Sequence, residues 1–161
     1  MSQPRKCGDL VILVRLASTS DAEGVARLLH DFNMEFDTPS PGVPVIAARL
    51  RKLLGEESTF ALLAGDPSVG VALVTLRPNV WYDGPVALLD ELYVEPDLRD
   101  RGIGAAMIGM LAEECAARGV KVIEINVDEG DTDTMRFYER HGFALIQPDS
   151  GERAFYFSRE L

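Results

Sequence analysis

Hydrophobic residues follow two different spacings along this chain, and the spacing indicates which segments form strands and which form helices. Runs rich in apolar and β-branched residues predict strands, whereas apolar residues three and four apart predict helices. The predicted strands cover residues 10–16, 59–64, 69–76, 86–94, 120–127, 144–146 and 153–158, the last two as an antiparallel pair. The predicted helices begin near residues 20, 43, 103 and 132. This order predicts a mixed α/β fold with about seven strands and about four helices, one of them a crossover helix between the strands at 86–94 and 120–127.

Polar residues and glycines mark the predicted ends of these helices. Ser20, with a glutamate three positions later, matches a capping box at the start of the first helix. Asp131, or the threonine after it, can cap the fourth helix with a side-chain oxygen. Gly119 and Gly142 are predicted to end the third and fourth helices, because glycine readily adopts the left-handed conformation that commonly follows a helix.

Residues 88–106 combine a strand, a proline that stops it and a glycine-containing turn that leads into a helix. The first turn of a helix presents unpaired N–H groups and a partial positive charge, so it can bind an anion. Gly102 and Gly104 let a phosphate approach the backbone, and Arg99 and Arg101 add positive charge. The stretch lacks the Lys-Ser/Thr pair of a Walker loop and the third glycine of the dinucleotide fingerprint. It predicts a pyrophosphate site of another kind, with an ordinary strand-loop-helix as the alternative.

Two blocks of sequence resemble the GNAT superfamily of N-acetyltransferases. The spacing Arg-x-x-Gly-x-Gly at 99–104, after Leu-Tyr-Val-x-Pro at 92–96, resembles the acetyl-CoA motif of that family. Phe-Tyr-Glu-Arg-His-Gly-Phe at 137–143 resembles its Phe-Tyr-Glu-Lys-x-Gly-Phe block. The resemblance implies the GNAT fold, with a mostly antiparallel mixed central sheet, in a single domain over residues 1–161 whose residues 1–9 form a flexible tail. It also implies acetyl-CoA as co-substrate and no metal.

The same resemblance implies which residues meet the co-substrate. Main-chain groups of the central strand would pair with pantetheine, and the turn would hold the pyrophosphate. The residues so implied are Leu92, Tyr93, Val94, Arg99, Asp100, Arg101, Gly102, Ile103, Gly104 and Ala105. Tyr138 matches the tyrosine that protonates the departing thiolate, with a packing role as the alternative. Asp131 and Thr134 stand where the family commonly has Asn and Ala, which puts any co-substrate contact from Asp131 in doubt.

Two adjacent carboxylates on the central strand, Asp90 and Glu91, are the candidates for taking the proton that an acceptor amine must lose. Strict alternation points them to opposite faces, so only one faces the acceptor directly unless a bulge intervenes. The pair, with Trp81 in the preceding loop, loosely resembles a Glu-Asp pair and loop tryptophan of diamine and polyamine acetyltransferases.

Two further groups of residues are candidates for binding the acceptor. Trp81 and Tyr82 could hold an ammonium group against their ring faces, or they could form an exposed hairpin tip. Glu35 and Phe36 follow the first helix, in a region that lines the acceptor site in GNAT relatives. The alternative for them is the plain end of an amphipathic helix.

Composition narrows the classes of function. The formal net charge of −10 argues against a nucleic-acid surface and is compatible with a cationic acceptor. Two cysteines and two histidines argue against a disulfide framework and a zinc site. No apolar run is long enough for a membrane span, and no secretory signal is evident, so we expect a cytoplasmic location without membrane contact.

The sequence as a whole therefore predicts an acetyl-CoA-dependent N-acetyltransferase. The acetyl group would pass to a primary amine, a small cationic one, by direct attack and without an acyl-enzyme. Two alternatives stay open: acetylation of protein N-termini or lysines, and a non-catalytic acyl-CoA-binding sensor or interaction module. The resemblance is compatible with a homodimer, and the sequence does not identify the acceptor.

Overall fold

The structure is a computed structural model that describes residues 12–161. The predicted tail over residues 1–9 and the start of the first predicted strand lie outside the described residues. The described residues form two compact units, one that ends at residue 124 and one over residues 125–161. The organisation as a single domain stays a prediction, and each unit is described by itself below.

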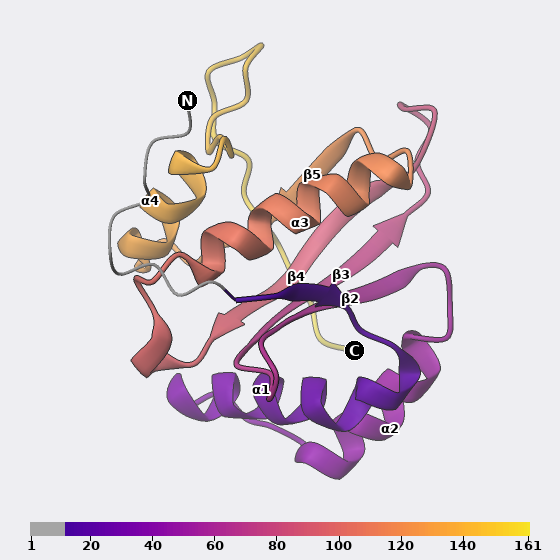
Figure 1. The fold of residues 1–161 in the computed structure, drawn as a ribbon. Helices are drawn as coiled ribbons and strands as arrows, with labels where there is room; N and C mark the ends of the chain where they lie inside the picture. The colour runs from indigo at the N-terminus through magenta and orange to yellow at the C-terminus, as the bar shows by residue number, and fades with distance from the viewer. Residues whose placement is uncertain (1–11) are drawn as a thin grey trace, which may run out of the picture. The chain divides into compact units, whose positions relative to one another are not determined.

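One mixed sheet of five strands organises the larger unit, with the strand order β1-β2-β3-β4-β5 (Figure 1). The strands are β1 (Val14–Leu16), β2 (Thr59–Ala64), β3 (Gly70–Arg77), β4 (Val86–Val94) and β5 (Val122–Ile125). The pairs β1–β2, β2–β3 and β3–β4 are antiparallel. Strand β4 leads to β5 through a crossover helix, which is the connection that a parallel pair requires. The predicted bounds of β2 and β4 are confirmed to the residue.

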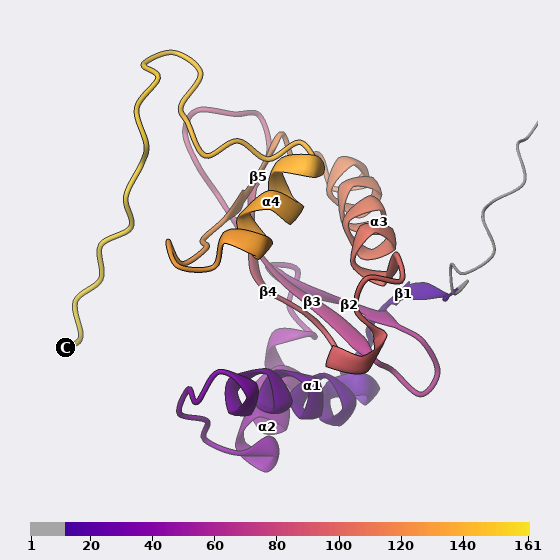
Figure 2. The ribbon, with the colours of Figure 1, turned by 90° about the vertical axis from the view of Figure 1, so that its left-hand side faces the viewer.

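Four α-helices lie in the described residues: α1 (Ala22–Glu35), α2 (Val43–Leu53), α3 (Ile103–Ala117) and α4 (Thr132–Arg140). Within the larger unit, α1 and α2 lie on one face of the sheet and α3 lies on the other (Figures 1 and 2). Short 3-10 turns precede α1 at Thr19–Asp21 and follow β4 at Pro96–Leu98. The predicted mixed α/β architecture is confirmed.

The core beneath α1 and α2 forms where their apolar faces meet the sheet. Val25 and Leu28 of α1 and Val71 of β3 are completely buried there, and Leu50 of α2 is 2% exposed. Tyr93 of β4 belongs to the same cluster. Because this cluster joins both helices to β3 and β4, it fixes the position of α1 and α2 over the central strands.

The predicted cap at Ser20 is wrong, because Ser20 lies inside the 3-10 turn and α1 begins at Ala22. Asp21 organises this helix start instead. Its carboxylate accepts the Ser18 N–H at 2.8 Å and both Arg15 Nη atoms, at 2.9 and 2.8 Å. The hydrogen bond from Arg15 lowers the pKa of Asp21, and the Ser18 N–H lowers it further. The capping box therefore joins Ser18 and Asp21 at the 3-10 turn, two residues before the predicted position.

The predicted ends of α3 and α4 are confirmed. Gly119 and Gly142 follow the two helices with φ of 73° and 88°, the left-handed conformation that glycine adopts without strain. Asp131 caps α4 by accepting the Thr134 N–H at 3.2 Å.

The predicted total of about seven strands is wrong, because the final antiparallel pair does not form. In its place, Ile146 and Arg153 make a single antiparallel bridge. The backbone between them closes a tight loop, in which Gln147 N–H donates to Glu152 O and Gly151 N–H donates to Gln147 O, each at 2.9 Å. A strand pair requires a ladder of successive backbone hydrogen bonds. The segments on either side of this loop are joined by one bridge only, so they do not form a strand pair.

Candidate active site

A β-bulge interrupts the pairing of β4 with β3 at the predicted carboxylates. Leu73 of β3 faces Glu91, whereas Val74, the next residue, faces Leu89. Asp90 is therefore an extra residue on β4 without its own partner on β3. Bulges of this kind bend a strand and re-aim its side chains, and they are common beside active sites.

The bulge brings both carboxylates to the same face of the sheet. Leu73 and Thr75 share one face of β3, because they are two residues apart. Glu91 is paired with Leu73, and Thr75 Oγ1 donates a hydrogen bond of 2.5 Å to Asp90 Oδ2. Leu73 packs against the cluster formed with α1 and α2, so this is the face those helices cover. Strict alternation, which predicted opposite faces, is wrong at this position.

Glu91 extends into a cavity of about 240 Å³ between β4 and the helices α1 and α2. The cavity walls are mainly aliphatic, with three polar side chains among them. The lining residues are Leu29, Asn33, Pro41, Ile46, Arg49, Leu50, Leu53 and Glu91. A small apolar cavity with a few polar groups is the usual form of a site for a small molecule.

The surroundings of Glu91 alter its acidity. Burial in this cavity raises the pKa of Glu91, and the negative charge of Asp90 raises it further. A carboxylate with a raised pKa is a stronger base than an ordinary exposed glutamate, which suits it to accept a proton near neutral pH. Perturbed carboxylates in cavities are candidates for acid-base chemistry.

The predicted anion-binding turn lies between β4 and α3, where the sequence placed it. Asp100 and Gly102 have φ of 59° and 84°, so the backbone turns sharply before α3 begins at Ile103. A Cβ added to Gly102 would meet no heavy atom of the described residues within 4 Å, so the space beside it is open. Left-handed residues before a helix direct neighbouring N–H groups into one concavity that suits an anion.

Arg99, predicted to meet the pyrophosphate, is an exposed residue whose guanidinium bonds to other groups of this chain. Its guanidinium donates two hydrogen bonds of 2.6 Å to the carboxylate of Glu35, at the end of α1. Its Nε donates to the Val94 carbonyl at 2.9 Å. The structure thus brings together Glu35, a predicted acceptor residue, and Arg99, a predicted co-substrate residue. This contact ties the turn to the end of α1.

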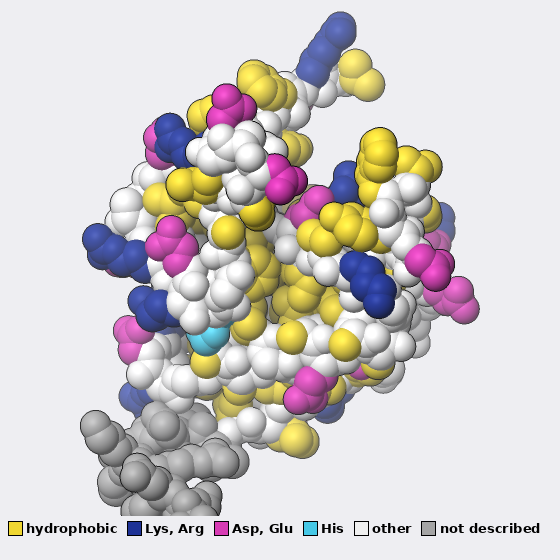
Figure 3. Space-filling view, turned by 90° about the horizontal axis from the view of Figure 1, so that it is seen from above, with side chains coloured by type: hydrophobic (Ala, Val, Ile, Leu, Met, Phe, Trp, Pro, Cys, Tyr) yellow, Lys and Arg dark blue, Asp and Glu magenta, His cyan; other side chains and the backbone are white. Residues whose placement is uncertain are grey.

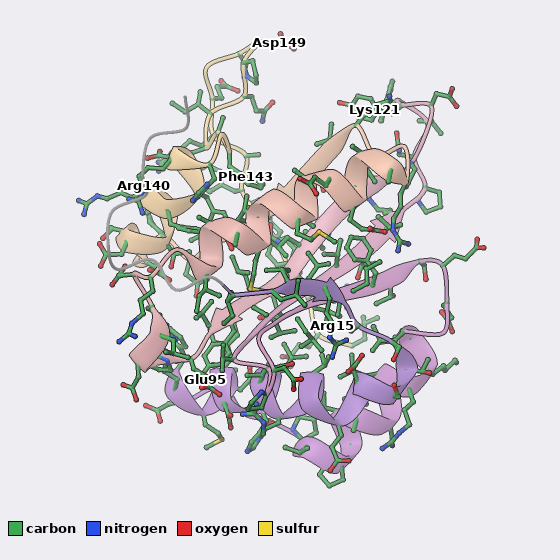
Figure 4. All side chains as sticks on the ribbon, viewed as in Figure 1. Arg15, Glu95, Lys121, Arg140, Phe143 and Asp149 are labelled. Atoms are coloured by element: carbon green, nitrogen blue, oxygen red, sulfur yellow. The ribbon has the colours of Figure 1, made fainter. Side chains whose placement is uncertain are left out.

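A second ion pair ties α1 to the end of β4. Glu95 follows β4 and lies beside α1 (Figure 4), where Arg27 Nη1 is 3.3 Å from its carboxylate. Tyr93 adds an aromatic contact, because its ring stacks on Phe32 with 5.2 Å between centroids. The side chain of Tyr93 is therefore part of the core, and only its main chain is available to a co-substrate.

The predicted aromatic acceptor residues are not among those that line the cavity beside Glu91. Trp81, 84% exposed, and Tyr82 are in the loop after β3, where their N–H groups donate to Asn79 Oδ1 at 2.9 Å. Phe36 ends α1 and packs edge-on against Phe32, at 5.3 Å between centroids. Their roles in acceptor binding stay predictions.

In the smaller unit, Tyr138 is buried on α4. Its ring packs edge-on against Phe143 and Phe137, with 5.3 Å between centroids in each case. These contacts fix the orientation of the phenol within this unit. Its role as an acid stays a prediction.

Sequence reasoning missed two polar residues of the cavity, Asn33 and Arg49. Each lies on a helix that the sequence predicted, and each falls beside apolar positions of that helix. Arg49 stands three residues after Ile46 and four before Leu53, so helical spacing puts all three on one side of α2. This helical spacing is the feature of the sequence from which Arg49 could have been predicted to lie beside those apolar residues.

Acidic and basic side chains are interspersed on the face shown in Figure 3. Within residues 12–161, no group of three or more His, Cys, Asp or Glu residues is arranged to hold a metal ion. The described helices include none that is long and apolar enough to cross a membrane.

Comparison with known proteins supports the resemblance seen in the sequence. A crystal structure of an Arthrobacter sp. FB24 protein assigned as an acetyltransferase is 48% identical, with a TM-score of 0.87, over 92% of this chain and 96% of that one. Thialysine N-epsilon-acetyltransferase of Bos taurus is 26% identical in an alignment that covers 92% of this chain and 94% of the relative. An uncharacterized N-acetyltransferase of Methanocaldococcus jannaschii is 40% identical over 58 residues, 36% of this chain and 26% of that protein.

The family assignment rests on most of the chain. Residues 25–143, from α1 to the glycine turn after α4, match the acetyltransferase (GNAT) family. Both sequence blocks that resemble the family lie within this range. The chain therefore belongs to the GNAT family and is an acetyl-CoA-dependent N-acetyltransferase.

Proposed function

We propose that this enzyme acetylates the primary amine of a small cationic acceptor, which binds in the cavity beside Glu91. The observation that carries the proposal is the bulge at Asp90, because it sets two carboxylates on the face where the cavity lies. Carboxylates attract an ammonium group, and one of them can then accept its proton. The cavity, of about 240 Å³, is smaller than most sites for drug-sized ligands, which favours a small amine. A relative named for acetylating thialysine adds support.

In this proposal the co-substrate meets the C-terminal end of β4 and the turn that follows it. The turn from Arg99 to Ala105 holds the pyrophosphate, and the main chain of Leu92 and Val94 pairs with pantetheine. The open space beside Gly102 supports this assignment, since a phosphate needs close approach to the backbone. With Arg99 bound to Glu35, the N–H groups of the turn and Arg101 supply most of the attraction for the phosphates.

The proposed reaction is a direct transfer without an acyl-enzyme. Glu91 takes a proton from the bound ammonium group, which leaves a neutral nitrogen with a free electron pair. That nitrogen forms the new C–N bond to the acetyl carbon, and the C–S bond breaks with its electrons going to sulfur. Tyr138 donates its proton to the departing sulfur, and main-chain N–H groups of β4 polarise the carbonyl oxygen. The nitrogen, which carries a positive charge after the attack, then loses a second proton to water to give the neutral amide, and Tyr138 regains a proton from water.

A screen for coenzyme A thiol release tests this function and separates it from the alternatives. Diamines, polyamines, amino acids, aminoglycosides and peptides would be compared as acceptors at equal concentration. We expect turnover with small amines that carry a positive charge. Turnover with peptides alone would instead indicate a protein acetyltransferase, and binding of acetyl-CoA without any turnover would indicate a sensor.

We predict that Tyr138→Phe lowers kcat about tenfold and leaves the Kd for coenzyme A nearly unchanged. The expected loss is below the roughly 10²–10⁴-fold that is typical of acid catalysis, because a thiol with a pKa of about 8.5 leaves without full protonation. Steady-state kinetics and calorimetry measure the two quantities. A Tyr138→Phe enzyme with the kcat of the wild type would contradict the acid role.

Replacing Asp90 by asparagine should move the acid limb of kcat/KM to lower pH. The charge of Asp90 raises the pKa of Glu91, so removing it makes Glu91 ionise, and act as a base, at lower pH. The pH profile of kcat/KM reports this pKa in the free enzyme. Asp66→Asn, an exposed carboxylate in the turn after β2, serves as the control and should leave the limb in place. An unmoved limb in Asp90→Asn would rule out the coupling.

A further inference from the structure

The cavity beside Glu91 carries two opposite charges that do not pair with each other. Glu91 extends from β4 and Arg49 from α2, and both line the same space of about 240 Å³. Both side chains are among the described residues, and no ion pair connects them. Aliphatic side chains of α1 and α2, Leu29 and Ile46 among them, form the wall that the two charges share.

Arg49 forms no ion pair with any carboxylate of residues 12–161. Helix α2 (Val43–Leu53) contains neither Asp nor Glu, so no acidic residue can neutralise Arg49 from the same helix. In the described part of the chain, no other element supplies an ion pair to Arg49 either. Arg99 and Arg27, by comparison, are each paired with a carboxylate. Arg49 thus offers a planar, forked donor to a carboxylate that enters the cavity from outside.

We propose that the acceptor carries a carboxylate as well as its reacting amine, and that Arg49 binds this carboxylate while the amine faces Glu91. The acceptor then belongs to the amino acids that have a second amine, or to similar zwitterionic amines with an apolar chain between the charges. The aliphatic wall contacts that chain. This inference rests on the proposed function, since it takes the cavity beside Glu91 as the acceptor site. Two separate charges in one cavity select such a molecule over a simple diamine.

Pairs of acceptors that differ only by a carboxylate test the inference. L-lysine would be compared with cadaverine, and L-ornithine with putrescine, as substrates of the wild-type enzyme. We expect kcat/KM to be about tenfold or more higher for the carboxylate-bearing member, because a charged hydrogen-bonded pair contributes roughly 1.5–3 kcal/mol. Equal or higher kcat/KM for the diamines would overturn the inference.

The variants Arg49→Gln and Arg51→Gln test whether Arg49 is the residue that causes the preference for acceptors with a carboxylate. Arg49→Gln should lose about tenfold or more in kcat/KM for L-lysine, mainly through KM, while cadaverine is unaffected. Arg51, two residues along α2, does not line this cavity, so Arg51→Gln should behave as the wild type. An equal loss on both acceptors would show that Arg49 only packs on the surface, which would contradict the inference.

The same assays distinguish failure of this inference from failure of the proposed function on which it rests. If diamines are acetylated as well as amino acids and Arg49→Gln changes nothing, the inference fails and the proposed function stands. If none of the four amines is acetylated but another small amine of the screen is, the inference fails and the proposed function stands. If an enzyme that binds acetyl-CoA acetylates no small amine, both fail.

Discussion

Replacing Glu91 by glutamine is expected to lower kcat by on the order of 10²-fold and to leave coenzyme A affinity unchanged. The amide keeps the size and shape of the side chain but cannot take a proton from the acceptor, and a positioned base contributes at least that factor. Steady-state thiol release and calorimetric titration with coenzyme A measure the two quantities. Glu113→Gln, an exposed carboxylate on α3, should match the wild type in both.

Stability measurements show whether a loss of activity in Glu91→Gln reflects chemistry or misfolding. Because the pKa of Glu91 is raised in the folded state, folding favours its protonated form. The stability linked to this group is present at low pH and is lost as pH rises through the folded-state pKa. At neutral pH glutamine removes that penalty, so the variant should unfold with a free energy equal to or above that of the wild type. An active Glu91→Gln enzyme would rule out Glu91 as the base.

Replacing Gly102 by alanine is expected to weaken acetyl-CoA binding by on the order of 10²-fold, through loss of charge-assisted hydrogen bonds to the phosphates. The added methyl group would contact no heavy atom of the described residues, so the steric clash that we expect is with the bound phosphate. Gly102 also has φ of 84°, and alanine in this conformation costs about 1–2 kcal/mol of stability. Loss of binding must therefore be separated from loss of stability.

Gly119→Ala is the matched control for this variant. Gly119 follows the other end of α3, has φ of 73°, and also faces open space. Both variants should lose a similar free energy of unfolding, while only Gly102→Ala loses affinity for acetyl-CoA in calorimetry. If the two folded variants bound acetyl-CoA with equal affinity, the pyrophosphate would not bind at the turn that contains Gly102.

Local signals account for the parts of the fold that the sequence predicted well. Pro96 lacks an N–H and so stops β4, and the glycine turn then leads directly into α3. The positions of Gly119 and Gly142 predicted the ends of two helices, because the required backbone conformation depends on single residues. These features depend on a few neighbouring positions, and the backbone of the glycine turn before α3 is among them.

The acceptor side of the site depends on contacts between distant segments, so the sequence predicted it only in part. The bulge at Asp90 is set by the register of β4 against β3, which no pattern within β4 reveals. The hydrogen bonds between Arg99 and Glu35 join residues 64 positions apart. The role of Arg49 in the cavity wall follows from how α2 packs. The predicted strand pair after α4 was wrong for a similar reason. Alternating apolar residues indicate that a segment can form a strand, but they do not show which segment it pairs with.

Single-turnover mass spectrometry tests the central claim, acetyl transfer to an amine with Glu91 as base, most directly. The enzyme would be mixed with acetyl-CoA, sampled, and then mixed with the acceptor that the thiol-release screen favours. We predict an unmodified protein before the amine is added, then one acetyl group on the amine nitrogen with an equal amount of free coenzyme A, and a much slower reaction in Glu91→Gln. An acetylated protein before amine addition, or transfer at the wild-type rate by Glu91→Gln, would contradict this account.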